Sequence, residues 1–165
     1  MKRVLIATLL TMLVVSTMAM PSGEARAADA SSELGLVTKK GSFEDARQDL
    51  QDAVINAGLK IDYQGAIGKM LERTAADIGA TKPIYKNAEF FTFCSAALSR
   101  AMMEADPANV GFCPYVMFVY ERADKPGEVI VGYRKPPSSS ANPAAQKAFA
   151  AIENLLQKIL KEAAK

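Results

Sequence analysis

The segment between residues 115 and 134 constrains the fold of this chain more than any other. Residues 115–121 (YVMFVYE) and 128–134 (EVIVGYR) are rich in β-branched and aromatic side chains, which favour strands. Pro126-Gly127 lies between them and is a turn dipeptide. The pattern predicts an antiparallel hairpin, and the alternation places Val129, Val131 and Tyr133 on one of its faces.

The rest of the chain alternates between strand patterns and helix patterns. Further strands are predicted at 34–40, 59–64 and 89–94. The last of these has consecutive apolar residues, so we expect it to be a central strand covered on both faces. Ser42 and Ser95 each stand directly before a helical pattern and are natural N-caps.

The remaining patterns complete the order of elements. A short helix carrying Leu71 and Ile78 is predicted to end at Gly79, and 109–111 is predicted to be a loop. Asn142 and a long apolar stripe predict a C-terminal helix over 143–164. The expected order β-α-β-α-β-α-β-β-α is that of an α+β fold. It predicts a single two-layer domain with a mostly antiparallel sheet and helices packed on one face. Packing of the last helix on the sheet is favoured over the alternative, a homodimer through its apolar seam.

The N-terminus has the layout of a secretory signal peptide. Lys2 and Arg3 precede an apolar run, and Ala25-Arg26-Ala27 matches an A-x-A cleavage site. We predict a cleavable signal peptide at 1–27, a flexible leader at 28–33 and one domain at 34–165. The expected location is the periplasm of a Gram-negative cell. The alternative, an uncleaved membrane anchor, is disfavoured because helix-breaking residues and the cleavage site follow the apolar run.

Charge argues against polyanionic partners. The whole chain has 20 Lys and Arg against 18 Asp and Glu. Removing residues 1–27 takes away three basic residues and one acidic residue, which leaves 17 of each and a net charge of zero. Nucleic-acid binding needs a basic surface, so no nucleic-acid partner is expected, nor a membrane after cleavage. The expected partner is a small ligand or a periplasmic protein.

The chain contains no histidine and two cysteines, which excludes several kinds of site. A Ser-His-Asp or Cys-His nucleophile, a histidine-ligated metal and an imidazole base all need a residue that is absent. Two cysteines cannot form a Cys₄ zinc or iron–sulfur site. We therefore expect no metal and no cofactor, and we favour a binding role over an enzyme without excluding the latter.

Six short motifs between residues 42 and 135 carry a family resemblance. They are Ser42-Phe43-Glu44, Gly58-Leu59-Lys60 with Ile61-Asp62, Phe93-Cys94-Ser95-Ala96, Met102-Met103 with Ala105-Asp106-Pro107, Cys113-Pro114-Tyr115, and Val131-Gly132-Tyr133-Arg134. Together they resemble the bacterial domain-of-unknown-function family numbered 302. The resemblance implies a small α+β fold related to the two-layer architecture of TATA-box-binding protein. It implies no DNA binding and no established activity, because fold does not carry function. The resemblance also implies that the Cys94 and Cys113 pair is a feature of an exported branch of this family.

The two cysteines support two hypotheses. Cys94 ends a predicted strand and Cys113 precedes another, and an oxidising compartment favours a structural disulfide between them. The alternative is a periplasmic thiol-redox protein in which Cys94, at a helix N-terminus, is the nucleophile and Cys113 the resolving thiol. Cys113-Pro114-Tyr115 is similar to a glutaredoxin site, but Val116 stands where that site has its second cysteine. We favour an exported, non-enzymatic binding or accessory module with a structural disulfide.

Five residues near these cysteines and at the hairpin end are candidate ligand contacts. Arg134 is suited to a carboxylate or a phosphate because its guanidinium presents paired donors. The full set is Ser95, Asp106, Pro114, Tyr133 and Arg134.

Overall fold

The computed structural model describes residues 30–165. The predicted signal peptide and its cleavage site lie outside the described residues. Residues Ala30–Glu33, which fall inside the predicted flexible leader, form a short 3₁₀ helix.

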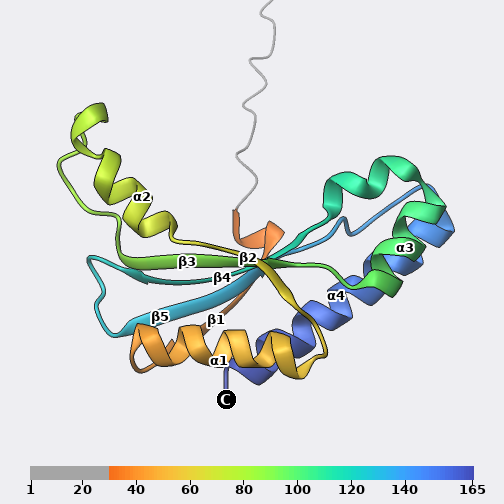
Figure 1. Cartoon of the computed structure of the whole chain (residues 1–165), viewed down its shortest axis with the longest axis horizontal. Coiled ribbons are helices and arrows are strands. Elements are labelled where there is room, and N and C mark those ends of the chain that lie inside the picture. Colours follow the sequence, from red (N-terminus) through yellow and green to blue (C-terminus); the bar gives the residue numbers. More distant parts are fainter. Residues whose placement is uncertain (1–29) are drawn as a thin grey trace, which may run out of the picture.

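A five-stranded antiparallel sheet forms the centre of the structure (Figure 1). Its strands lie in the order β1-β5-β4-β3-β2. The predicted hairpin is confirmed, with Val119 paired to Val131 and Met117 paired to Tyr133. The strands are β1 (Leu34–Lys40), β2 (Ile61–Gly65), β3 (Tyr85–Phe93), β4 (Tyr115–Arg122) and β5 (Glu128–Arg134).

Within residues 30–165, four α-helices accompany the sheet, so the predicted α+β fold class is confirmed. They are α1 (Phe43–Asn56), α2 (Ile67–Thr74), α3 (Ala96–Ala105) and α4 (Pro143–Ala163). The long helices α1 and α4 form the second layer on one side of the sheet, while α2 and α3 lie at its two opposite ends (Figure 1). Within the described part of the chain, no helix is both long enough and apolar enough to cross a bilayer.

The helix starts are set by side-chain caps at the predicted positions. Ser42 Oγ accepts a hydrogen bond from the backbone N–H of Asp45 at 3.0 Å. Asn142 Oδ1 accepts from the N–H groups of Ala144 and Ala145 at 2.9 and 3.3 Å. These bonds satisfy backbone donors that have no partner inside the helix. The short helix predicted around 71–78 is instead two pieces, α2 and a 3₁₀ helix at Ala76–Ile78.

The hydrophobic core lies between the sheet and the α1–α4 layer. Alternate residues of β4 are fully buried there, since Met117 and Val119 have no exposed surface. Leu50 of α1 and Phe149 of α4 belong to the same buried cluster. The opposite face of β4 carries Phe118 and neighbouring side chains that are only partly buried.

Two predictions about elements differ from the structure. The strand predicted at 89–94 begins four residues earlier, at Tyr85, although it is an interior strand as expected, because β3 lies between β4 and β2. Residues 85–89 are mostly polar, and they become a strand because they pair with the second half of β4. Residues 109–111 are part of a 3₁₀ helix, Pro107–Phe112, because Asp106 caps its start by accepting from the Ala108 N–H at 2.9 Å.

Glu121 is a buried carboxylate at the turn end of the β4–β5 hairpin. It is 3% exposed and accepts from the Gly127 N–H at 2.8 Å. It also accepts from Lys86 Nζ at 3.1 Å and from Asn87 Nδ2 at 3.3 Å. The bond from Gly127, aided by those from Lys86 and Asn87, lowers the pKa of the Glu121 carboxyl despite its burial.

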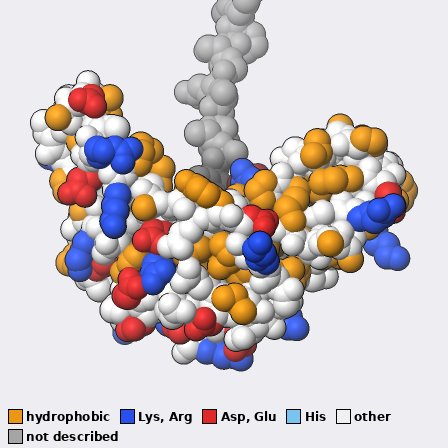
Figure 2. Space-filling view, in the orientation of Figure 1, with side chains coloured by type: hydrophobic (Ala, Val, Ile, Leu, Met, Phe, Trp, Pro, Cys, Tyr) orange, Lys and Arg blue, Asp and Glu red, His pale blue; other side chains and the backbone are white. Residues whose placement is uncertain are grey.

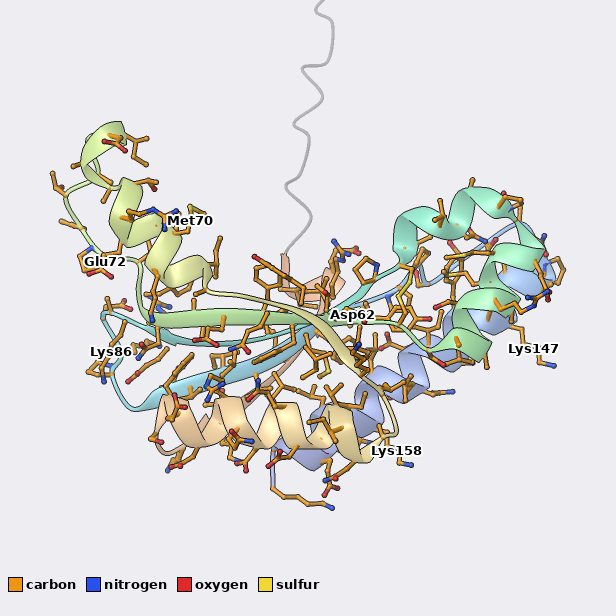
Figure 3. The ribbon with its side chains drawn as sticks, viewed as in Figure 1. Asp62, Met70, Glu72, Lys86, Lys147 and Lys158 are labelled. Carbon is orange, nitrogen blue, oxygen red and sulfur yellow. A yellow bond between two sulfur atoms is a disulfide. The ribbon has the colours of Figure 1, made fainter. Side chains whose placement is uncertain are left out.

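Charged and apolar side chains are unevenly spread over the surface. In the view of Figure 2, charged side chains are frequent over α1 and α2, whereas apolar side chains gather over the α3 end. Asp62 of the family-like motif lies on the edge strand β2 with its side chain exposed, and Met70 and Glu72 lie on α2 (Figure 3). Lys147 and Lys158 are exposed residues of α4.

Candidate ligand-binding site at the disulfide end of the sheet

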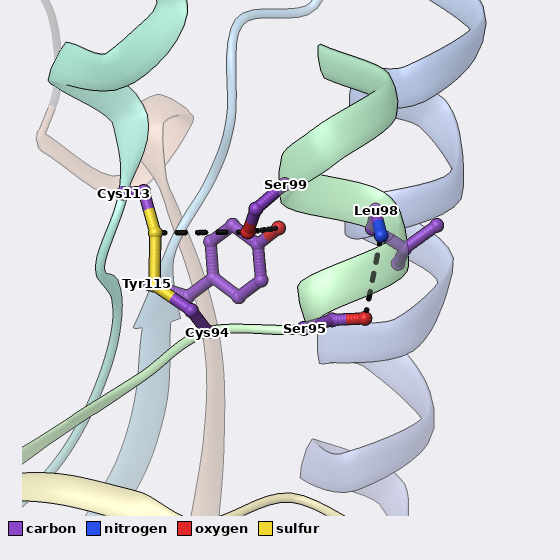
Figure 4. The surroundings of a disulfide bond; sticks show 6 residues. All are labelled: Cys94, Ser95, Leu98, Ser99, Cys113 and Tyr115. Atoms are coloured by element: carbon purple, nitrogen blue, oxygen red, sulfur yellow. Dashed lines mark hydrogen bonds between the residues drawn. A yellow bond between two sulfur atoms is a disulfide. The ribbon is translucent and has the colours of Figure 1, made fainter. Parts of the chain in front are cut away.

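A disulfide joins Cys94 and Cys113 at one end of the sheet (Figure 4). The S–S distance is 2.03 Å and the Cα–Cα distance is 6.4 Å. Cys94 follows β3 and Cys113 precedes β4, and the pairing of Phe93 with Tyr115 brings these strand ends together. The predicted pairing of the two cysteines is therefore present in the structure.

A buried pair of hydroxyls lies beside this disulfide. Ser99 Oγ is 2.9 Å from Tyr115 Oη and 3.6 Å from Cys113 Sγ (Figure 4). Burial raises the pKa of Tyr115, although the hydrogen bond with Ser99 acts in the opposite direction. Tyr115 therefore stays protonated at neutral pH, and the two hydroxyls and the sulfur form a short polar chain.

Two of the five candidate contacts serve as caps. Ser95 Oγ accepts from the Leu98 N–H at 3.5 Å at the start of α3. The Asp106 carboxylate accepts from the Ala108 N–H. Neither residue lines any of the cavities described below.

The other three candidates lie at two cavities close to the disulfide. The larger cavity has a volume of about 570 Å³, and we call it the sheet-end cavity. Pro114 and Arg134 both line it, although they are distant in sequence. Its apolar wall includes Phe112, Val116 and Pro136. The structure thus joins two of the predicted residues in one ligand-sized space.

The charged side of the sheet-end cavity carries two cations and one carboxylate. The side chain of Arg134 is exposed and makes no hydrogen bond or ion pair within residues 30–165. Lys135 donates from Nζ to the Ser32 carbonyl at 3.0 Å and from its N–H to the Glu33 carbonyl. Glu33 supplies the carboxylate of the lining. The guanidinium of Arg134 is therefore available to an acidic group.

Tyr133 faces the other way, toward α4. It is 2% exposed, and its Oη donates to Glu153 Oε1 at 2.6 Å. Burial, together with the hydrogen bond to Glu153, raises the pKa of Tyr133 well above its usual value. Tyr133 lines a second cavity of about 390 Å³, which we call the helix-side cavity. Residues 135–137 line both cavities.

Several lining residues were not predicted from the sequence. Val116 alternates with the buried residues of β4, so the sequence pattern places it on the opposite face of the strand. The pattern does not indicate that this face borders a cavity. Phe112 lies in the 3₁₀ helix and contacts Phe149 edge-to-face, with ring centroids 5.2 Å apart. Glu153 directly follows the buried Ile152 of α4, so the sequence pattern places it beside the buried face of the helix but does not indicate a cavity.

Within the part of the chain that the structure describes, no cluster of Cys, Asp and Glu has the composition of a metal site.

This arrangement defines a class of protein: a small antiparallel α+β domain with ligand-sized cavities at a disulfide-closed end. The model of the DUF302 family, a domain of unknown function, matches residues 36–163, and the chain belongs to this family. The fold is similar to that in a crystal structure of an uncharacterized conserved DUF302 protein from Bacillus stearothermophilus. The TM-score is 0.66 at 16% sequence identity, with 81% of this chain and 98% of that chain covered. A search of curated proteins finds no match.

Proposed function

We propose that this protein is an exported, non-enzymatic binding module that takes a small acidic molecule with an apolar body in the sheet-end cavity. The observation that supports this proposal is a cavity of about 570 Å³ that combines an apolar wall with Arg134. The guanidinium of Arg134 has no partner in the described structure. Cavities of roughly 300–1,000 Å³ are typical for small-molecule ligands.

The chemistry of the lining supports an acidic ligand. A guanidinium can donate two parallel hydrogen bonds to a carboxylate or a phosphate, and such charge-assisted bonds are stronger than neutral ones. Phe112, Val116 and Pro136 offer apolar surface for the rest of the ligand. The negative charge of Glu33 disfavours a ligand with several acidic groups along the cavity. It is compatible with a ligand that has one acidic group placed at Arg134.

The disulfide is proposed to have a structural role in this site. Cys113 stands directly before Pro114, which is part of the cavity lining. The bond to Cys94 ties this wall to the end of β3. A disulfide is compatible with an oxidising compartment and therefore with the proposed export.

The test is a ¹⁵N NMR titration of the purified protein with hexanoate and, separately, with 1-hexanol. We expect hexanoate to bind more tightly, with shifts at Val116 and Phe112. Arg134→Gln should weaken hexanoate binding by about 10-fold or more, since hydrogen bonds to charged groups contribute about 1.5–3 kcal/mol. Arg73→Gln on α2, at the opposite end of the sheet, is the matched control and should change nothing.

Equal binding of the acid and the alcohol would contradict the acidic-ligand proposal. Shifts centred elsewhere would contradict its location. Hexyl phosphate, run beside hexanoate, distinguishes the two acidic groups, because either one fits the guanidinium.

A second candidate function, thiol–disulfide exchange, is favoured by the Ser99 hydroxyl beside Cys113 Sγ. On reduction by an external dithiol, this hydroxyl can donate to a Cys113 thiolate and so stabilise it. The measurement is the reduction potential of the bond. A value below about −300 mV is typical of a structural disulfide, and a higher value supports exchange.

A further inference from the structure

The carboxylate of Glu153 on α4 has an unusual hydrogen-bond pattern. Its Oε1 accepts two bonds, from Tyr133 Oη at 2.6 Å and from Gln157 Nε2 at 2.9 Å. Its Oε2 is buried and has no hydrogen-bond partner within residues 30–165. Buried acceptors in native proteins are nearly always paired, so this oxygen is able to accept a hydrogen bond from a donor outside the protein chain.

The position of this carboxylate is fixed by its neighbours. Tyr133 stays protonated because its pKa is raised, so it remains a donor to Oε1. The Tyr133 ring in turn packs over Gly35, where an added Cβ would lie 2.1 Å from Tyr133 Cε1. Both donors engage the same oxygen. The carboxylate is thus held in place, while its second oxygen, Oε2, accepts no hydrogen bond from the described residues.

Glu153 lines the helix-side cavity of about 390 Å³. The same cavity is lined by Phe149 and by the two prolines Pro136 and Pro137, which give it apolar walls. Lys135 also lines it, but its ammonium is bound to the Ser32 carbonyl at 3.0 Å. A donor for Oε2 would therefore sit against apolar surface, where a charge-assisted hydrogen bond is strong.

The proline segment and Glu153 line the same cavity. Proline has no backbone N–H, so residues 136 and 137 cannot donate main-chain hydrogen bonds to α4. The segment is anchored on either side, by the Lys135 N–H on the Glu33 carbonyl and by the Ser140 N–H on Gln146 Oε1 at 2.6 Å.

We propose that the helix-side cavity binds a small protonated primary amine, whose ammonium donates to Glu153 Oε2 while its alkyl part packs against Phe149 and the prolines. An ammonium supplies both the donor and the charge that a desolvated carboxylate requires. This site is distinct from the Arg134 site of the proposed function. A negative binding result at one site does not contradict the proposal for the other.

The probe is n-butylamine, which is protonated at neutral pH. Binding is followed by NMR titration of the full purified protein. We expect saturable shifts at Phe149 and at the Gln157 side-chain amide. 1-Butanol, which lacks the charge, and tetramethylammonium, which lacks an N–H donor, should each bind at least 10-fold more weakly.

Glu153→Gln places an amide where the carboxylate stood and should weaken butylamine binding at least 10-fold. Glu162→Gln removes the same charge from an exposed position of the same helix and should leave binding within 2-fold. Ala150→Leu adds bulk at an exposed residue that lines the cavity, and it should also weaken binding without touching the Glu153 pair.

The proposal is overturned if butylamine binds no better than butanol, or if Glu153→Gln leaves its binding unchanged. It is equally overturned if Glu162→Gln weakens binding as much as Glu153→Gln does, since that result would reflect surface charge alone. Ala150→Leu keeps the test decisive if Glu153→Gln fails to fold, because unchanged binding in that variant would also refute the site.

Discussion

Reduction of the Cys94–Cys113 bond should destabilise the fold by an amount that follows from the length of the loop it closes. The two cysteines are 19 residues apart. In the chain-entropy model, a cross-link of this span removes enough freedom from the unfolded chain to stabilise the native state by about 3 kcal/mol. Small domains are stable by only about 5–15 kcal/mol, so the effect is a large share of the total.

The assay is urea unfolding followed by circular dichroism, with and without a phosphine reductant. Reduction retains every side chain, so the difference reports closure of the loop rather than lost packing. We expect the free energy of unfolding to fall by about 3 kcal/mol. The melting temperature should fall by about 10 °C, since 1 kcal/mol corresponds to about 3–4 °C at this chain length.

The double variant Cys94→Ala, Cys113→Ala is the control, because its stability should be unaffected by the reductant. A difference below about 1 kcal/mol between oxidised and reduced protein would refute the reasoning. That result would mean that the reduced chain keeps its α3 segment in place without the bond, or that the unfolded chain is already compact.

Three further predictions concern stability. Gly35→Ala forces a Cβ to 2.1 Å from Tyr133 Cε1 and should cost about 1–3 kcal/mol in urea unfolding, whereas Gly111→Ala, whose Cβ meets nothing within 4 Å, should cost far less. The lowered pKa of Glu121 adds stability that is present above the unfolded-state value of about 4.3 and is lost as pH falls toward the lower folded-state pKa. Glu121→Gln should therefore show a smaller loss of stability between neutral pH and acid, and an unchanged pH profile would contradict this assignment. Asn142→Ala removes the cap of α4 and the bond to the Ala105 carbonyl at 2.8 Å, and should lower thermal stability by about 1 kcal/mol, while Asn142→Asp should retain the cap.

Local patterns were enough to predict most of the fold. The hairpin of β4 and β5 follows from alternation and a turn dipeptide, and the starts of α1, α3 and α4 follow from caps next to apolar stripes. These signals act over a few residues, so they can be recognised without knowledge of the rest of the chain. The first half of β3 could not be recognised in this way, because residues 85–89 owe their strand conformation to pairing with β4.

The candidate sites depended much less on local pattern. Arg134 and Pro114 were singled out for their chemistry, but the cavity that joins them is also lined by Glu33 and Leu156, which come from opposite ends of the domain. Ser95 and Asp106 have side chains suited to ligands and equally suited to capping, and the sequence does not distinguish these uses. The orphan oxygen of Glu153 results from the positions of Tyr133 and Gln157 around it, which only the packed structure defines.

The strand order also bears on how this chain can fold as it is made. β1 pairs only with β5 among the described strands, and its first residue, Leu34, is paired with Arg134. That contact joins two strands that are far apart in the chain, and contacts of such long sequence separation slow folding. The strand β1 therefore cannot pair until β5 has been made. A nascent chain of this design can form its β2–β3–β4 pairings early, but it cannot complete the sheet until residue 134 has been made.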